Sequence, residues 1–188
     1  MNHLAHAWLA GDDEGMLVGS LLGDFWRGAP DPAWDLGVAE GVRLHRRIDA
    51  FTDQHPAVVA ARTLFEPPFR RYAGILMDVW FDHLLARDFE ARCGVPLREF
   101  ADRTYATLAR APASLPPAFR LFAARAAQFD VLVGYVERER LDAVFARLSE
   151  RLSRANPIAH ALPVLESLDA PLARAFDALW GDLVRLRP

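Results

Sequence analysis

The sequence predicts an all-α fold, a single-domain helical bundle. In this chain of 188 residues, 52% are hydrophobic and 25% are charged, which is typical of a globular protein with a real core. Alanine and leucine dominate, isoleucine is scarce, and no alternating strand pattern persists. The single cysteine, Cys93, excludes an internal disulfide and a cysteine-rich zinc site.

The first third of the chain predicts three helices. A short helix is expected over residues 2–10, and a second runs from about residue 14 to Gly28. Asp31 is a good N-cap and Pro32 suits a first helical turn, so a third helix is expected from there to about Asp53.

The remainder also predicts helices, separated by proline and glycine. A helix restarts at Pro56 and is broken by Glu66-Pro67-Pro68. The longest and most apolar helix is expected over 69–92, with Gly94 as its stop, and further helices over 97–110, 117–135, 137–154 and 163–186. Residues 111–117 form the one proline-rich joint, and we read 1–188 as one domain.

Charge and hydropathy exclude several classes of protein. The net charge of −3 gives no general field for nucleic acid. No apolar run reaches the roughly 18 residues of a membrane span. Acidic residues at 12–14 interrupt any signal sequence, so we expect a cytoplasmic protein with neither nucleic-acid nor membrane partners. All 22 basic residues are arginine, so each basic contact to a phosphate uses a guanidinium. The oligomeric state stays open.

The segment from Leu44 to Asp53 carries the most unusual chemistry. His45, Asp49 and Asp53 follow one another four residues apart and therefore share a helix face. Burying such groups without partners is costly, so a metal or a phosphate would account for them. The alternative is that the two aspartates only pair with Arg46 or Arg47 along the helix.

Further acidic and histidine residues lie at unusual positions. Asp24 follows an apolar run, and Asp78 and Asp82 stand one turn apart in the most hydrophobic helix, with His83 beside them. A carboxylate there usually pairs with a cation or a metal. The alternatives are that Asp82 caps a helix or pairs with an arginine, and that His83 is a hydrogen-bonded core histidine. His6, on the first helix, is a ligand or supporting candidate.

Together these residues favour a metal site built from several helices. Histidine nitrogen with several carboxylate oxygens suits Mn²⁺, Mg²⁺ or Fe²⁺ better than structural zinc. Such an ion lowers the pKa of bound water and polarises a phosphoryl oxygen, so the predicted reaction is metal-assisted phosphoester hydrolysis. The predicted ligands are Asp24, His45, Asp49, Asp78 and Asp82; Arg27, Arg46 and Arg47 would hold the phosphate, and His83 or His6 would transfer protons.

Several motifs closely resemble those of the acyl carrier protein phosphodiesterase family in order and spacing: Met1–His6, Leu21–Gly28, His45–Asp49, Phe51–Asp53 and Asp78 with Asp82-His83. They cover about the first half of the chain. The resemblance implies a helical fold atypically related to the HD phosphohydrolases and a manganese-dependent activity that needs Asp24. It implies that the substrate is holo-acyl carrier protein, whose 4′-phosphopantetheine–serine phosphodiester is hydrolysed to apo-carrier and 4′-phosphopantetheine.

Two departures and two rival readings accompany this resemblance. The order Asp82-His83 is the reverse of an HD dyad, and His3 stands where an aromatic residue is expected, which we expect to affect only local packing. The rivals are a related metal phosphohydrolase acting on a nucleotide or another small phosphoester, and a non-enzymatic helical binding module. Because carrier proteins of this type are acidic, a local basic patch is expected from Arg43, Arg62, Arg70 and Arg71.

Overall fold

The computed structural model describes all 188 residues and contains helices only, which confirms the predicted all-α class. None of its helices combines the length and hydropathy needed to cross a bilayer. The α-helices are α1 (His3–Leu9), α2 (Glu14–Leu22), α3 (Leu36–Gln54), α4 (Pro56–Arg62), α5 (Ala73–Arg87), α6 (Phe89–Cys93), α7 (Leu97–Ala109), α8 (Pro117–Gln128), α9 (Val131–Gly134), α10 (Arg138–Arg151), α11 (Leu162–Ser167) and α12 (Asp169–Leu183). Short 3-10 segments are η1 (Gly23–Phe25), η2 (Arg70–Tyr72), η3 (Ile158–His160) and η4 (Val184–Leu186).

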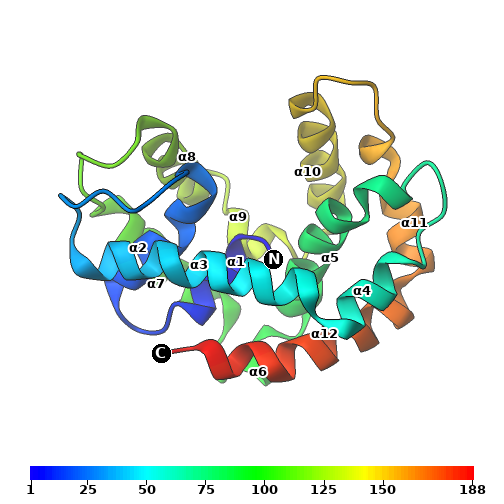
Figure 1. Cartoon of the computed structure of the whole chain (residues 1–188), viewed down its shortest axis with the longest axis horizontal. Helices are drawn as coiled ribbons and strands as arrows, with labels where there is room; N and C mark the ends of the chain where they lie inside the picture. Colours follow the sequence, from blue (N-terminus) through cyan, green and yellow to red (C-terminus); the bar gives the residue numbers. More distant parts are fainter.

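The helices form two groups with a gap between them (Figure 1). One group contains α2, α7 and α8, and the other contains α4, α5, α10 and α11. Helix α3 runs below the gap from the first group toward the second, and α1 and α9 lie near its floor. A cluster of 49 buried apolar residues extends from Met1 to Leu183 and includes residues of every α-helix.

Helices α2 and α3 pack with their backbones in direct contact. A Cβ on Gly19 would lie 2.0 Å from the carbonyl oxygen of Val38, and one on Gly41 would lie 2.3 Å from that of Met16. Only glycine permits this approach. The close packing brings the end of α2, with Ser20 and Gly23, against the middle of α3.

A buried carboxylate of α5 holds the first turn of helix α1. Asp82 of α5 accepts hydrogen bonds from the backbone N–H groups of Leu4, at 2.7 Å, and Ala5, at 3.2 Å. These groups belong to the first turn, where a helix has no internal acceptors. The position of Asp82 therefore fits the alternative of a helix cap: it caps the first turn of α1 and attaches this helix to α5.

Several predicted helix boundaries are wrong. The expected helix over 69–92 divides at Asp88, that over 117–135 divides at Phe129-Asp130, and that over 163–186 divides at Leu168. The third helix begins at Leu36 rather than near Asp31, because Asp35 accepts the hydrogen bond from Gly37 N–H and serves as its N-cap. The expected relation to the HD phosphohydrolases stays a prediction.

Candidate metal centre

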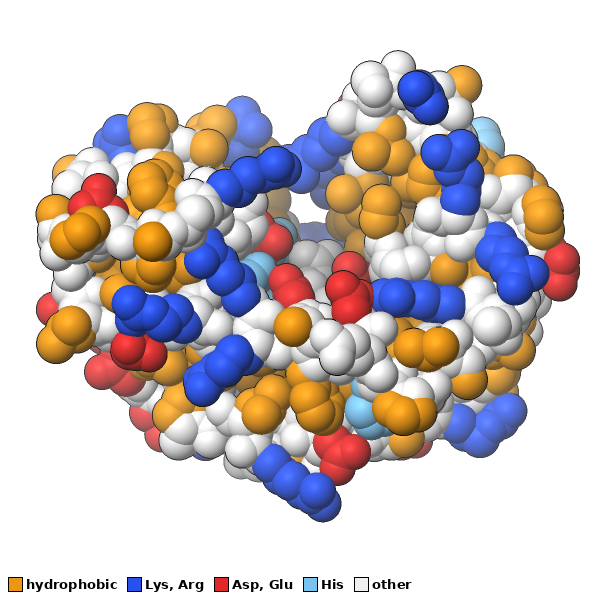
Figure 2. Space-filling view, in the orientation of Figure 1, with side chains coloured by type: hydrophobic (Ala, Val, Ile, Leu, Met, Phe, Trp, Pro, Cys, Tyr) orange, Lys and Arg blue, Asp and Glu red, His pale blue; other side chains and the backbone are white.

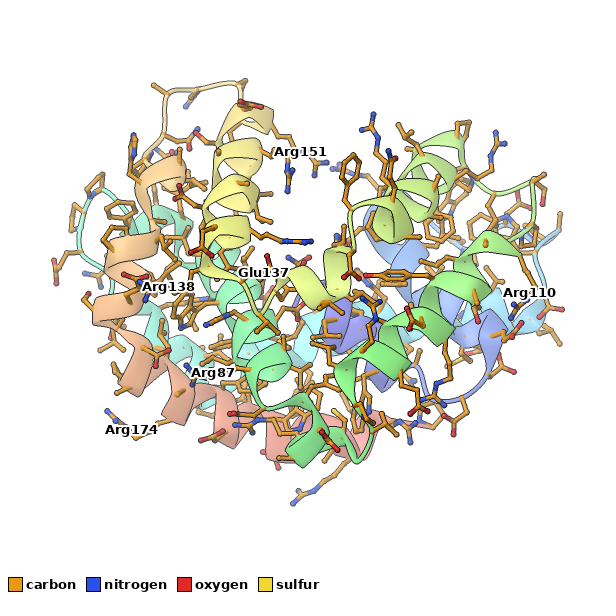
Figure 3. All side chains as sticks on the ribbon, turned by 180° about the vertical axis from the view of Figure 1, so that it is seen from behind. Arg87, Arg110, Glu137, Arg138, Arg151 and Arg174 are labelled. Atoms are coloured by element: carbon orange, nitrogen blue, oxygen red, sulfur yellow. The ribbon has the colours of Figure 1, made fainter.

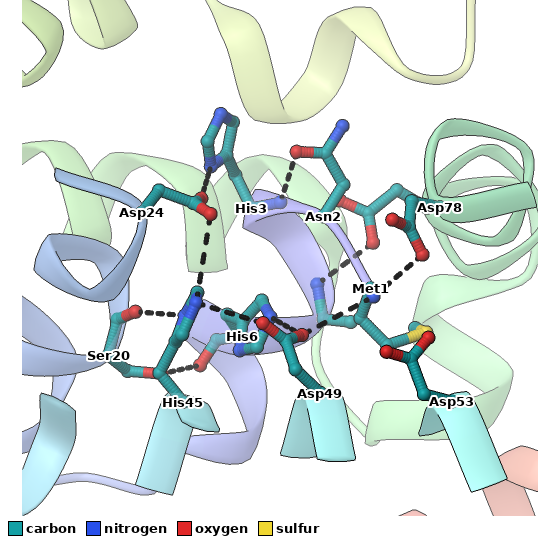
Figure 4. A network of polar contacts seen from close by, with 12 residues as sticks. Met1, Asn2, His3, His6, Ser20, Asp24, His45, Asp49, Asp53 and Asp78 are labelled. Carbon is teal, nitrogen blue, oxygen red and sulfur yellow. Dashed lines mark hydrogen bonds and ion pairs between the residues drawn. The ribbon is translucent and has the colours of Figure 1, made fainter. Parts of the chain in front are cut away.

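Two histidines and one aspartate converge at the floor of the gap (Figure 4). His6 comes from α1, and His45 and Asp49 stand one turn apart on α3. One donor atom from each lies within 4.8 Å of the others. Nε2 of His6 is 3.1 Å from Asp49 Oδ1, and Nε2 of His45 is 3.1 Å from Asp49 Oδ2. The imidazole rings stack with centroids 4.0 Å apart. This is a donor arrangement that fits a cation.

The orientation of His45 is fixed by a backbone carbonyl. Its Nδ1 lies 2.8 Å from the carbonyl oxygen of Ser20, which can only accept, so Nδ1 carries the hydrogen. In the neutral ring the Nε2 lone pair then faces the Asp49 carboxylate, an arrangement that calls for a proton or a cation between them. Burial lowers the pKa of His45, but the hydrogen bond to Asp49 and the charges of Asp49 and Asp24 outweigh it and raise this pKa.

His6 is the most buried member of the centre. The residue is 1% exposed, and its Nδ1 is buried without a hydrogen-bond partner. Burial is the main reason that the pKa of His6 falls to about 4. The ring is therefore neutral near pH 7, which is the form that coordinates metals.

Asp24 approaches the centre from the side open to solvent. It lies in η1, and its Oδ1 is 3.7 Å from His45 Nε2 while its side chain stays 44% exposed. Burial raises the pKa of Asp24, but the contact with His3 and the positive charges of neighbouring histidines lower it to about 2. Asp24 is therefore a carboxylate at neutral pH. A Cβ on Gly23 would lie 2.2 Å from His45 Cγ, so this glycine lets η1 come so close.

His3 is a member of this network that the sequence pattern assigned to local packing. Its Nδ1 lies 3.4 Å from Asp24 Oδ2, and its ring packs against Phe122 with centroids 4.6 Å apart. The available signal was its spacing of three residues from His6, which places both rings on adjoining sides of one helix.

Asp78 reaches the edge of the centre through the α-amino group of Met1. That nitrogen lies 2.9 Å from Asp78 Oδ1 and 3.6 Å from Asp49 Oδ1 (Figure 4). Burial lowers the pKa of this amine, but the charges of Asp78 and Asp49 outweigh burial and raise it to about 10. Asp78 is thus neutralised by an ammonium group, and Asp53 pairs with Arg62.

Asp82 and His83 are not brought to the centre as expected. Both carboxylate oxygens of Asp82 hold backbone N–H groups of α1. Nδ1 of His83 donates to the carbonyl oxygen of Tyr135 at 2.7 Å, and its ring packs on Trp80. The position of His83 fits the alternative of a hydrogen-bonded core histidine. We leave both residues out of the ligand set proposed below.

The three predicted phosphate-binding arginines differ in their surroundings. Nη2 of Arg46 donates to the carbonyl oxygen of Trp26 at 3.2 Å, while Arg27 and Arg47 are exposed and form no ion pair. In the expected basic patch, Arg43 pairs with Glu40 and Arg62 with Asp53, whereas Arg70 and Arg71 are exposed.

The centre is accessible from outside. Figure 2 shows the molecule hollowed between its two groups of helices, with acidic and histidine side chains at the floor and arginines around the rim. The side chain of Asp49 is 41% exposed, as is expected at the floor of an open hollow. A ligand from solvent can therefore reach the donor groups.

Comparison with known proteins agrees with the resemblance of the sequence motifs. The model of the family described as "Acyl carrier protein phosphodiesterase" matches residues 1–183. The chain is similar to acyl carrier protein phosphodiesterases of Photorhabdus laumondii (43% identity over 48% of this chain and 46% of that protein) and of an Enterobacter species (41% over 63% and 62%). It is also similar to that of Pectobacterium atrosepticum (39% over 64% and 63%).

The aligned part thus spans about half to three fifths of each of these relatives. No solved structure matches the chain. Because the family model covers nearly all of the sequence, this chain belongs to the acyl carrier protein phosphodiesterase family.

Proposed function

We propose that this protein hydrolyses the phosphodiester that joins 4′-phosphopantetheine to a serine of holo-acyl carrier protein. The products are apo-carrier and free 4′-phosphopantetheine. The proposal is supported by the family and by the names of the relatives. The observation that carries it is the convergence of His6, His45 and Asp49 at the floor of an open hollow.

A divalent cation, with Mn²⁺ preferred over Mg²⁺ and Fe²⁺, suits this set of donors. Two imidazole nitrogens and carboxylate oxygens are the mixture that such ions take in proteins. The Ser20 carbonyl holds His45 in the tautomer whose Nε2 is free to coordinate. When bound, the cation lowers the pKa of water and polarises a phosphoryl oxygen.

Asp24 and His3 complete the centre on the side from which substrate arrives. Asp24 offers Oδ1 toward His45, while His3 lies against its other oxygen. We assign Asp24 as the fourth ligand and His3 as the residue that keeps its carboxylate in place. Asp82 acts at a distance, because it fixes the helix that carries His3 and His6.

Arginines on the open side bind the phosphoryl oxygens. The guanidinium of Arg46 is anchored on the carbonyl of Trp26 through one nitrogen, which leaves its other N–H groups for a phosphate. Arg27 has no acidic partner and adds positive charge, whereas Arg47, two residues from both His45 and Asp49 on α3, faces away from them. Such groups stabilise the charge that grows on the oxygens as the leaving serine departs.

Docking of the acidic carrier requires local positive charge, since the chain as a whole carries −3. Arginines on the rim of the hollow supply it (Figure 2). Exposed charges are screened by salt, so the KM for holo-carrier should rise as ionic strength increases. An unchanged KM between low and high salt would count against docking by charge.

The decisive experiment measures the mass of holo-acyl carrier protein after incubation with the enzyme and Mn²⁺. We expect loss of the whole 4′-phosphopantetheine group, prevented by a chelator and restored by added Mn²⁺. Asp24→Ala should lose at least about 100-fold in kcat/KM with unchanged helical circular dichroism. Asp53→Asn is the matched control, because it removes a carboxylate one turn beyond Asp49 that pairs with Arg62. Full turnover by Asp24→Ala would refute the assignment.

A further inference from the structure

A second feature of the hollow has no role in the chemistry above. A cavity of about 390 Å³ lies between the end of α8, helix α9 and the first half of α10. Its walls combine apolar side chains, among them Phe129, Val131 and Val144, with the hydrogen-bond donors of Tyr135 and Arg147. This volume and this mixture of groups are typical of a site for an amphipathic small molecule or chain.

The cavity borders the gap between α8 and α10. Helix α9 lies behind α1 in Figure 1 and in front of it in Figure 3, where the gap between α8 and α10 is seen from the other side. Glu137 marks the end of α10 near the floor of this gap, and Arg151 marks its far end. The cavity therefore lines the side of the gap made by α8, α9 and α10, whereas the metal centre lies on the side made by α1 and α3.

Tyr135 connects the cavity with α5. It lines the cavity, its backbone carbonyl holds His83, and its side chain is almost fully buried. Burial raises the pKa of Tyr135 well above its ordinary value, and the charges of Asp82 and Asp24 raise it further. Asp82, next to His83 on α5, holds the first turn of α1, the helix that carries His3 and His6, so α5 joins this wall of the cavity to the centre.

The walls of the cavity are tied in place. The Tyr105 hydroxyl donates to Asp130 Oδ1 at 3.1 Å and accepts from Leu132 N–H at 2.8 Å. Arg140 bridges to the other wall, donating to the carbonyl oxygen of Phe129 at 2.8 Å and to Glu137 Oε2 at 2.8 Å. In contrast, Arg147 forms no ion pair and no hydrogen bond, so its guanidinium is free for a ligand.

We propose that this cavity holds the pantetheine chain of the substrate. The inference rests on the proposed function. A phosphodiester at the metal centre has one arm on the folded carrier, which must stay outside on the rim. Its other arm is a flexible chain with a geminal dimethyl group, a hydroxyl, two amides and a thiol. The apolar walls suit the methyl and methylene groups, and Tyr135 and Arg147 suit the amide carbonyls.

Filling the cavity tests this inference. In Val144→Trp the KM for holo-carrier should rise by about tenfold or more, while the Mn²⁺ affinity from calorimetry stays at the wild-type value. The matched control is Ala106→Trp, which fills a separate cavity of about 320 Å³ beside α7 and should leave KM unchanged. Arg147→Ala, an exposed position that folding does not require, should also raise KM, with partial rescue by Arg147→Lys. Wild-type KM values in both Val144→Trp and Arg147→Ala would overturn the inference.

A second measurement separates this inference from the proposed function. Pantetheine, which lacks the phosphate, is titrated into Mn²⁺-loaded wild-type protein while methyl signals of Val131, Val144 and Ala106 are followed by NMR. We expect shifts at the first two positions and none at Ala106, and no shifts at Val131 in Val144→Trp. If holo-carrier keeps its mass but these shifts occur, the proposed hydrolysis fails, although the cavity still binds pantetheine. Absence of shifts in the wild type would overturn the cavity assignment alone.

Discussion

Adding one methyl group at Gly23 should disable the metal centre without touching a ligand. The ideal Cβ of Gly23→Ala lies 2.2 Å from Cγ and 2.4 Å from Cδ2 of His45. Carbon atoms normally stay at least about 3.5 Å apart, so the ring would have to move by about 1.3 Å. His45 is 4% exposed and held by the Ser20 carbonyl and by Asp49, so no free space receives it.

The expected cost has two parts. Overpacking a well-packed interior typically destabilises a protein by about 1–3 kcal/mol. Displacing the ring also removes the hydrogen bond to Ser20 that orients Nε2, and loss of such an orienting contact typically lowers metal affinity by about 10–100-fold. We therefore expect Gly23→Ala to remain folded with a lower midpoint in urea and to bind Mn²⁺ at least about tenfold more weakly.

Calorimetric titration with Mn²⁺ and urea denaturation measure the two parts separately. Gly181→Ala is the matched control, because its Cβ meets no atom within 4 Å. In a helix interior that change should stabilise the protein by up to about 1 kcal/mol and leave Mn²⁺ affinity unchanged. If folded Gly23→Ala bound Mn²⁺ as tightly as the wild type, the position of His45 would not matter and the proposed centre would be refuted.

Three further predictions follow from individual contacts. His3→Phe removes the group beside Asp24 and should weaken Mn²⁺ binding by about tenfold, with recovery in His3→Gln; equal affinity in His3→Phe would leave His3 a packing residue. Asp82→Ala leaves two buried N–H groups of α1 without an acceptor and should cost about 2–5 kcal/mol in urea unfolding, whereas a cost below about 0.5 kcal/mol would contradict the role of this carboxylate. The raised pKa of His45 in the free protein means that a proton competes with the metal for its ring. The Mn²⁺ affinity should be constant above that pKa and fall below it, by up to about tenfold per pH unit. A Mn²⁺ affinity that does not change between about pH 8 and 5.5 would argue against His45 as a ligand.

Local patterns in the sequence were sufficient for the fold class and for part of the centre. Apolar spacing and proline punctuation predicted the helices, and the four-residue spacing of His45 and Asp49 predicted their common face. The division at Asp88 has no proline or glycine beside it, so it follows from tertiary packing rather than from local preference. The division at Leu168 has a local cause, because Pro171 lies in the first turn of α12 and cannot continue a helix through Ser167.

The remaining assignments depended on contacts between distant segments. A carboxylate in an apolar helix fits a metal ligand or a cap equally well, and only the arrival of α1 above Asp82 separates these readings. The contact of His83 could not be predicted for the same reason, since its partner is a backbone carbonyl 52 residues away. His3 was undervalued because its neighbour Asp24 is set by the packing of α2 on α3.

Because their backbones touch at Gly19 and Gly41, helices α2 and α3 should move together as one rigid unit. This unit, with the η1 turn that follows α2, carries four residues of the centre and its support: Ser20, Asp24, His45 and Asp49. Helix α10, in contrast, packs chiefly on η3 and α11 in the opposite group. If the hollow widens to admit the proposed carrier, we therefore expect α10 to move away from α8, while the four side chains keep their positions relative to one another. Amide hydrogen exchange should accordingly be slowest along the paired glycine helices.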